Sequence, residues 1–174
     1  MAVLTSKWLW VLVAVVGIFA ALFVNSRTIM HTEIFIDAPP EDVWAVLMDT
    51  EKYPEWNPVF VEVDGQLEVG ASLANQVVEP GKDAVQMNAS VKAIVPNKEI
   101  NQGGGIPGIL TFDHHYYLEP ENGGTTVIQH EVDQGLYMYF WDSAWVEPAY
   151  ASVNEALKRR VAELNSDMDE SSEQ

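Results

Sequence analysis

Between residues 59 and 134 the sequence is a succession of short strand-like runs separated by turn signals, with no helical period between them. Each run is rich in β-branched or aromatic residues and stops at glycine, proline, asparagine or aspartate. The runs are VFVEVD (59–64), GQLEVG (65–70), ASLANQVVEP (71–80), AVQMNASVKAIVP (84–96), KEINQGG (98–104), ILTFDHHYYLEP (109–120) and TTVIQHEVDQ (125–134). Consecutive strands without a crossover helix pair antiparallel, so the segment predicts an antiparallel sheet. We expect its tightest turn at Asn122 and the glycines after it, which can supply positive φ.

One strand and two helical segments precede this sheet, and one long helix follows it. TIMHTEIFIDA (28–38) alternates like a strand, and DAPPEDVWAVLMDT (37–50) predicts a helix whose first turn carries two prolines and two acidic residues. After the sheet, apolar residues recur at spacings of three and four from Tyr150 to Leu164, behind Pro148 at the first turn. The remaining residues 166–174 are polar and acidic, and we expect them to be disordered.

The stretch YPEWNP (53–58) joins the second short helix, predicted at 51–56, to the first run of the sheet. Its two prolines exclude a continuous helix or strand. We expect a corner in which Tyr53 and Trp56 wedge the short helices against the sheet, while Asn57 satisfies backbone groups at the bend. Trp56 and Asn57 could also line a binding site beside that corner.

The N-terminal part of the chain is a separate element. Trp8 to Val24 are 17 consecutive uncharged residues between Lys7 and Arg27, at the lower limit of the roughly 17–25 residues that span a bilayer. The run is longer than the apolar region of a cleaved signal, about 7–15 residues, and no clear A-x-A site follows it. We therefore predict a single-pass membrane anchor with its linker at 1–27, a folded domain at 28–165 and a disordered tail at 166–174. Too few Lys and Arg flank the run to orient it.

Composition excludes several classes of function. Nine Lys and Arg stand against 26 Asp and Glu, a formal net charge of −17, which leaves no broad basic face for nucleic acid. The chain has no cysteine, so disulfides, thiolate nucleophiles and cysteine-ligated zinc are excluded. A metal would need His and carboxylate ligands, and we predict neither a metal nor another cofactor.

The order strand, two helices, antiparallel strands and long final helix is that of the helix-grip fold. The chain resembles the START/Bet v 1-like (SRPBCC) superfamily, in particular its bacterial polyketide cyclase/dehydrase-like members, over residues 29–165. The resemblance is carried by IDAPPEDVWAVLMDTEKYPEWNPVF (36–60), LEVGASL (67–73), IPGILTFDHHYYLEPENGGTTVIQHE (106–131), QGL (134–136) and NEALKRRVAEL (154–164). It implies an α+β fold in which a curved antiparallel sheet wraps a long C-terminal helix and leaves a largely apolar cavity. Because that cavity hosts carriers, receptors and cyclases alike, the resemblance does not settle function.

The run TFDHHYYL (111–118) carries candidate site residues. Neighbours on a strand point to opposite faces, so His114 and His115 cannot chelate one ion together. The resemblance implies that His114, Tyr116 and Leu118 point inward and that His115 and Tyr117 face solvent. An inward histidine is either a hydrogen-bonded wall residue or a general base.

The run TTVIQHEVDQ (125–134) can be read in two registers that differ by one residue. Hydrophobicity alone turns inward Ile128, His130 and Val132. The register of the resembling family instead turns inward Val127, Gln129, Glu131 and Asp133. In that second register Glu131 can lie beside His114 and form an acid-base pair, whereas in the first it is a solvated strand residue.

Two further segments could border the site. GGGIPG (103–108) matches G-x-G-x-x-G in letters, but a strand rather than a helix follows it, so we reject a nucleotide loop and expect a rim loop or a plain turn. YMYFWDSAW (137–145) gathers five aromatic residues. It is either a hydrophobic cluster that seals the final helix onto the sheet or an amphipathic lip that meets a bilayer or a lipid.

We predict membrane-anchored binding or transfer of a hydrophobic small molecule, lipid-like or isoprenoid-like, in an internal cavity. The alternative is an enzyme of the cyclase or dehydratase type that uses His114 with Glu131 or His130 as acid and base. A protein-interaction module is the weakest alternative, because the predicted outer faces are not notably apolar. The expected ligand-binding residues are Trp56, Asn57, Ile106, His114, Tyr116, Gln129, Phe140, Trp145 and Tyr150. The sequence does not identify the ligand, the side of the membrane or the oligomeric state.

Overall fold

The computed structural model describes residues 7–172. The chain begins with helix α1 (Lys7–Asn25), strand β1 (Thr28–Ile36), helix α2 (Pro40–Met48), the 3₁₀ turn η1 (Thr50–Lys52) and the short helix α3 (Tyr53–Trp56). Six strands follow, namely β2 (Phe60–Asp64), β3 (Ser72–Val77), β4 (Val85–Val95), β5 (Glu99–Ile106), β6 (Leu110–Glu121) and β7 (Gly124–Gln134). The 3₁₀ turn η2 (Leu136–Tyr139) then leads to the final helix α4 (Val146–Ser172).

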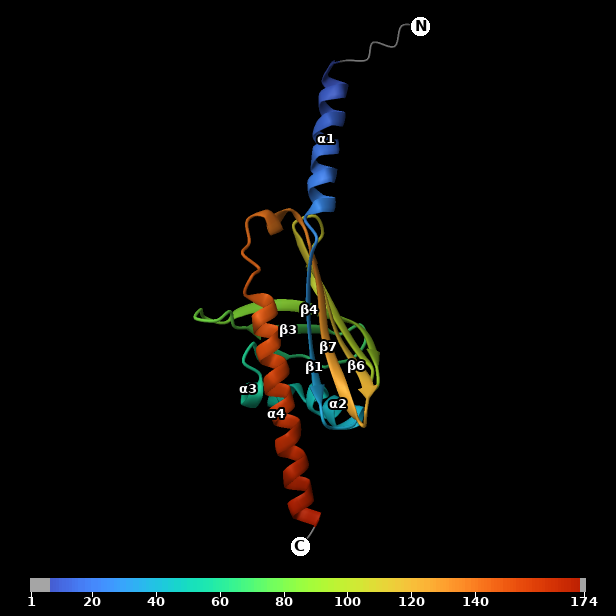
Figure 1. The fold of residues 1–174 in the computed structure, drawn as a ribbon. Coiled ribbons are helices and arrows are strands. Elements are labelled where there is room, and N and C mark those ends of the chain that lie inside the picture. Colours follow the sequence, from blue (N-terminus) through green and yellow to red (C-terminus); the bar gives the residue numbers. More distant parts are fainter. Residues whose placement is uncertain (1–6, 173–174) are drawn as a thin grey trace.

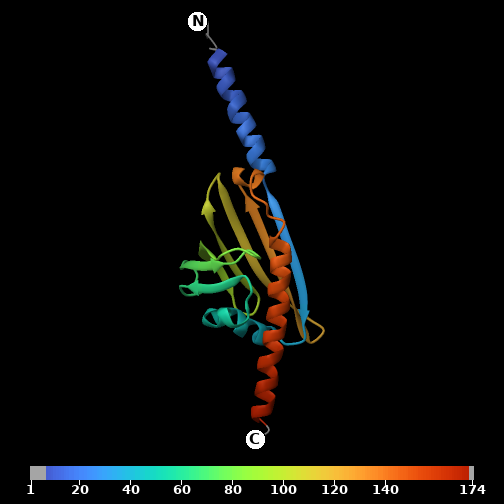
Figure 2. The same cartoon turned by 90° about the vertical axis from the view of Figure 1, so that its left-hand side faces the viewer.

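All seven strands form one antiparallel sheet in the order β1-β7-β6-β5-β4-β3-β2. The first two strands of the chain are therefore its two edges, and the other strands follow one another in sequence order. The sheet curves around α4, and α2 and α3 lie at the end of the sheet away from α1 (Figures 1 and 2). This arrangement confirms the predicted α+β helix-grip fold.

Glycine and asparagine set the turns of the sheet. Asn122 and Gly123 have φ angles of 49° and 87° in the turn between β6 and β7, the left-handed conformations that a tight hairpin turn requires. One predicted strand is absent, because residues 65–70 form the loop between β2 and β3. Gly65 and Gly70 have φ angles of 116° and 89° at its two ends, and these conformations do not fit a strand.

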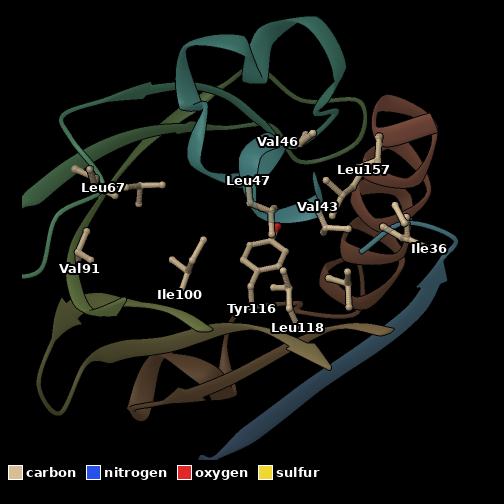
Figure 3. Packing of buried hydrophobic residues seen from close by; sticks show 14 of the residues in the cluster. Ile36, Val43, Val46, Leu47, Leu67, Val91, Ile100, Tyr116, Leu118 and Leu157 are labelled. Carbon is tan, nitrogen blue, oxygen red and sulfur yellow. The ribbon is translucent and has the colours of Figure 1, made fainter. Parts of the chain in front are cut away.

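The largest core cluster lies between the concave face of the sheet, α2 and α4. Leu47 on α2 and Leu157 on α4 are both fully buried. The other cluster members include Ile36, Val43, Val46, Leu67, Val91, Ile100, Tyr116 and Leu118. Figure 3 shows these side chains converging from the sheet and both helices. The core thus occupies the end of the concave side that is covered by α2.

Helix α4 buries one face along its first half. Its buried residues, most of them separated by three or four positions from another buried residue, are Val146, Ala149, Tyr150, Val153, Asn154, Ala156, Leu157 and Val161. The helix then continues to Ser172, past the boundary predicted at residue 165 and into the segment expected to be disordered. No glycine or proline stops it between residues 149 and 172, and Asn165 Nδ2 donates to Asp42 Oδ2 on α2 at 3.2 Å. Residues 173 and 174 lie outside the described part of the chain.

The YPEWNP segment forms the predicted corner. The Tyr53 hydroxyl donates to the carbonyl oxygen of Leu47 at 2.7 Å, and the Tyr53 and Trp56 rings pack edge to face with centroids 5.1 Å apart. Asn57 Oδ1 accepts hydrogen bonds from the backbone N–H groups two and three residues later, at 3.0 and 2.8 Å. These contacts hold the end of α3 against the start of β2.

Helix α1 projects away from the sheet (Figure 1). None of its residues is buried, and its mean hydropathy over an 18-residue window is 2.3. By length and composition it could be a membrane span or a signal sequence. Only residues 26 and 27 separate it from β1. The junction is bonded to the domain, because the Tyr139 hydroxyl donates to Leu22 O at 2.8 Å and Gly135 N donates to Ser26 Oγ at 3.1 Å.

Candidate functional site

A cavity of about 270 Å³ lies between the N-terminal half of α4 and the concave face of the sheet. A second hollow of about 30 Å³ continues it toward the core. Both are lined by Phe60, Met87, Phe112, Glu131 and Tyr150. Ligand cavities in proteins usually measure roughly 300–1,000 Å³. The volume of this cavity lies just below that range, which suits a small ligand.

Five of the residues that line the larger cavity are aromatic. Phe60 and Phe112 come from β2 and β6, Trp141 and Trp145 from the segment before α4, and Tyr150 from α4 itself. The Phe60 and Tyr150 rings are stacked with centroids 6.4 Å apart, and the two tryptophan rings meet edge to face at 6.3 Å. Such a wall contacts apolar or cationic groups favourably.

Strand β7 adopts the register of the resembling family. Val127, Gln129, Glu131 and Asp133 are all buried on the concave face. His130 lies on the outer face, where its ring meets that of His31 with centroids 5.8 Å apart. The register predicted by hydrophobicity alone is therefore wrong, and His130 cannot act inside the cavity. Ile128 and Val132 can lie on the outer face because side chains of the neighbouring strands β1 and β6 partly bury them there.

His114 points inward as predicted and stands directly opposite Glu131 in the β6–β7 pairing. Its Nε2 lies 3.3 Å from Gln129 Oε1, and Gln129 donates through Nε2 to Tyr150 O at 3.0 Å and Asn154 Oδ1 at 2.7 Å. Gln129 is thus fixed by α4 and orients the imidazole. Burial lowers the pKa of His114 to about 4, because the charged ring would lose its hydration there.

Glu131 and Asp133 form a buried carboxyl pair on β7. The two residues are only 5% and 2% exposed. The Tyr150 hydroxyl donates to Glu131 Oε2 at 2.7 Å. Burial, followed by the charge of Asp133, raises the pKa of Glu131 to about 8, and burial raises that of Asp133 to about 7. Two close carboxyl groups cannot both be charged cheaply, so the pair retains a proton near neutral pH.

Several buried polar atoms around the cavity have no hydrogen-bond partner among the described residues. They are Asn75 Oδ1, Tyr116 OH, Asp133 Oδ1 and Trp145 Nε1. Tyr116 and Asn75 line the smaller hollow, while Asp133 and Trp145 line the larger one. Buried polar groups are nearly always bonded in folded proteins, so these atoms point to a site that receives polar groups from elsewhere.

The predicted ligand-binding residues divide into those that line the cavity and those that do not. His114, Tyr116, Trp145 and Tyr150 line it, and Gln129 lies behind His114. Outside the lining are Trp56, Asn57, Ile106 and Phe140. Trp56 faces a groove between α2 and α4, and Asn57 uses its side-chain oxygen to cap the corner. Ile106 and Phe140 are 61% and 84% exposed.

The glycine-rich segment 103–108 is part of a hairpin rather than a flexible rim loop. Gly103 to Gly105 belong to β5 and pair with β6. A Cβ on Gly104 would lie 2.5 Å from the carbonyl oxygen of Asn88, so the chain needs glycine for close strand packing. Only Pro107 to Ile109 form the turn, and none of the six residues lines the cavity.

Sequence reasoning missed several lining residues, above all Phe60, Met87, Phe112 and Trp141. The inward position of Phe112 could have been found by counting back two residues from His114. Phe60 and Met87 offered no such reference, because no inward residue was assigned on β2 or β4. Asp133 was identified as inward in the correct register but was not proposed as a site residue.

A larger open groove of about 520 Å³ lies between α2 and α4, lined by Asp42, Lys52, Trp56 and Arg160 among others. Its charged groups face solvent, and Arg160 is bonded there to Glu55 at 2.7 Å. We therefore place the candidate site in the internal cavity, where the polar groups are buried. Among the described residues, no group of three or more His, Asp or Glu side chains could hold a metal ion.

Comparisons with known proteins agree with this fold. A family model described as "Polyketide cyclase / dehydrase and lipid transport" matches residues 27–162. No curated protein matches the chain significantly.

Among solved structures, the Zhui aromatase/cyclase from Streptomyces sp. R1128 superposes with a TM-score of 0.63 at 15% identity, over 78% of this chain and 94% of that one. Truncated norcoclaurine synthase from Thalictrum flavum gives 0.61 at 15% identity, over 78% and 93%. Ara h 8.0201 gives 0.60 at 17% identity, over 79% and 99%. At these identities the similarity establishes the fold alone.

Proposed function

Because the chain belongs to the polyketide cyclase/dehydrase and lipid transport family, we propose that it binds a hydrophobic small molecule under α4 and exchanges it with a bilayer in which α1 is anchored. The observation that carries this proposal is the cavity itself. Aromatic side chains from β2, β6, α4 and the segment before α4 line it, and it reaches the surface near Val85, which is 67% exposed. Its volume suits one small apolar molecule or part of a longer one.

The end of the domain next to α1 supports exchange with a bilayer. We call the exposed residues Ile106, Ile109, Tyr137, Tyr139 and Phe140 the η2 tip; each is at least 49% exposed. Backbone hydrogen bonds from Leu136 N and Tyr137 N, at 3.1 and 2.9 Å, join η2 to the β5–β6 turn. An exposed apolar and aromatic surface of this kind is typical of contact with membrane interfaces.

The cavity rim adjoins that tip. Trp141 lines the cavity and directly follows Phe140, which is the most exposed large hydrophobic residue among the described residues. The Tyr139 hydroxyl is bonded to the last turns of α1. A bilayer that surrounds α1 would therefore meet the η2 tip and lie close to the mouth of the cavity.

A matched pair of valine substitutions tests binding. Val77 lines the cavity, and Val69, in the loop before β3, is 64% exposed and lies outside it. In isothermal titration with 1-octanol, using the full chain in lipid nanodiscs and empty nanodiscs as reference, we expect one bound octanol per chain. Val77→Trp should weaken binding at least about fivefold by filling the cavity, and Val69→Trp should not.

Two results would contradict the proposal. One is an octanol heat that does not exceed that of the empty nanodiscs. The other is equal binding by wild type, Val77→Trp and Val69→Trp, which would show that octanol binds outside the cavity.

A second candidate function is acid-base catalysis of the cyclase or dehydratase type. It is favoured by the opposition of His114 and Glu131 across the β6–β7 pairing. At neutral pH the buried imidazole is neutral and can accept a proton, whereas Glu131 retains one to donate. An aldol ring closure forms a β-hydroxy carbonyl compound, and its dehydration requires a base that takes the α-proton and an acid that protonates the leaving hydroxyl, which are the states of His114 and Glu131.

Separate substitutions distinguish this enzyme from a carrier. With a linear poly-β-ketone as test substrate, an enzyme should form a product lighter by one water, and His114→Phe and Glu131→Gln should each abolish it. His130→Gln, on the outer face, is the matched control and should leave the product unchanged. Mass spectrometry that finds no dehydrated product with wild type rejects this enzymatic function for that substrate class.

A further inference from the structure

The charges around the cavity are unevenly distributed. Four carboxyl groups line it, two at the rim and two at depth, namely those of Glu79, Asp83, Glu131 and Asp133. The only ammonium group in the lining belongs to Lys82, whose Nζ is bonded to Glu79 Oε1 at 2.6 Å. The ammonium group of Lys82 is therefore neutralised at the rim, and the deep carboxyl groups face the cavity without a cation of their own.

Hydrogen bonds and burial fix the orientation of the deep carboxyl pair, Glu131 and Asp133. Tyr150 holds Glu131 through its hydroxyl, and Tyr150 O is itself bonded to Gln129 at 3.0 Å. Asp133 is 98% buried, and its Oδ1 has no hydrogen-bond partner among the described residues although it lines the cavity. An acceptor in that position requires a donor, and a carboxyl pair in an apolar site is stabilised most by a cationic donor.

The aromatic side chains complete a site for a cation. Phe60, Phe112, Trp141, Trp145 and Tyr150 surround the space in front of the carboxyl groups. The faces of these rings are electronegative and attract a cation or its adjacent methylene groups. A carboxylate ligand would instead meet the charge of Asp83 at the rim and the negative charge that remains on the deep pair, so like-charge repulsion disfavours an anionic lipid such as a fatty acid.

We propose that the ligand is a cationic amphiphile, a hydrophobic molecule with one protonated amine, whose ammonium group lies against Glu131 and Asp133 and whose apolar part lies among the aromatic side chains. This inference rests on the proposed binding function and specifies its ligand class. The amine displaces the proton that the carboxyl pair otherwise retains, so binding releases a proton near neutral pH. The other titratable or charged groups that face the pair are His114 and Tyr116 on β6, Tyr150 on α4, and Glu79, Lys82 and Asp83 at the rim.

Three probes of equal chain length separate the ligand classes. They are octylamine, 1-octanol and octanoate, titrated into the full chain in nanodiscs with empty nanodiscs as reference. At pH 8, where an alkylamine is still protonated as a lysine side chain is, octylamine should bind at least about tenfold more tightly than octanol, as a hydrogen bond to a charged group implies. Octanoate should bind more weakly than octanol.

Substitutions test whether Glu131 and Asp133 cause the tighter binding of octylamine. The double variant Glu131→Gln/Asp133→Asn keeps the shape of the pair and should bring octylamine to within about twofold of octanol, while octanol still binds. Glu119→Gln, at an exposed position on β6 outside the cavity lining, is the matched control and should leave the preference for octylamine unchanged. Affinity of wild type for octylamine should rise between pH 6 and pH 8, with proton release measured from the heats in two buffers, whereas octanol affinity should not change with pH.

The outcomes separate this inference from the function on which it rests. If octanol binds and octylamine binds no more tightly, or if octanoate binds most tightly, the cationic-ligand proposal is rejected and hydrophobic binding stands. If the preference for octylamine survives in the double variant, the deep carboxyl pair is not its cause and the proposal is equally rejected. If none of the three probes binds, both proposals fail.

Discussion

At the scale of single residues, the unusual feature is a pair of buried carboxyl groups, Glu131 and Asp133, of which Glu131 accepts a hydrogen bond from the Tyr150 hydroxyl. The unfolded chain would ionise Glu131 and Asp133 at ordinary carboxyl pKa values, whereas the folded protein retains protons on the pair to higher pH. A carboxyl group whose pKa is raised on folding stabilises the protein below its unfolded pKa. That stabilisation is lost as pH rises through the folded pKa. The pair therefore makes the free energy of unfolding depend on pH.

We predict that this free energy falls between pH 6.5 and pH 8 and that Glu131→Gln removes about half of the decline, because one of the two titrating groups is gone. Urea unfolding at intervals across this range measures it. His114 does not contribute in this window, because its pKa is lowered to about 4 and its stabilising effect is already complete above pH 6.5. Glu119→Gln, at an exposed position on β6, serves as control. An unchanged decline in Glu131→Gln would contradict the assignment of the buried proton.

Strands β6 and β7 show which parts of the site could be predicted from the sequence and which could not. On β6 the family resemblance implied that His114 and Tyr116 point inward, and both are buried. On β7 the polar residues are inside and Ile128 and Val132 are on the outer face. Hydrophobic periodicity therefore predicts the opposite of what forms, and only the family register was right.

At the scale of elements, α4 is the feature that the sheet wraps. Leu157 is fully buried against α2 and the strands, whereas Leu164, two turns later, is 37% exposed. We predict that Leu157→Ala lowers the free energy of unfolding by about 2–5 kcal/mol, as other buried leucines do, and that Leu164→Ala lowers it by less than about 1 kcal/mol. Urea denaturation followed by circular dichroism measures both. Equal losses would mean that the two ends of the helix are equally packed.

Element type was predictable wherever local signals agreed with tertiary contacts. Prolines and acidic residues marked the start of α2, and Asn122 with Gly123 marked the β6–β7 turn. The loop at 65–70 and the extension of α4 to Ser172 were not predicted. The loop forms because Gly65 and Gly70 adopt conformations that do not fit a strand. Residues 166–172 are polar and acidic, which suggested disorder, but they contain no glycine or proline to end the helix.

At the scale of the whole molecule, α1 is attached to the domain by few contacts and contributes no buried residue. We predict that deletion of residues 1–25, which keeps Ser26, leaves a soluble domain whose thermal midpoint lies within a few degrees of that of the full chain. The shortened chain should no longer float with lipid vesicles in a density gradient, whereas the full chain should. Aggregation of the shortened chain would show that α1 belongs to the core. Flotation without α1 would show that the domain binds lipid on its own.

The two-residue junction between α1 and β1 has a consequence for how such a molecule would move. A long flexible linker would let the domain tumble above a membrane and present its mouth only part of the time. Here the hydrogen bonds from the Tyr139 hydroxyl to Leu22 O and from Gly135 N to Ser26 Oγ restrict rotation of the domain about the junction. With α1 in a bilayer, the domain would diffuse in two dimensions with the η2 tip on the lipid side. Encounter with a ligand would then be a search within a plane, and its rate would scale with the surface density of the ligand rather than with its concentration in water.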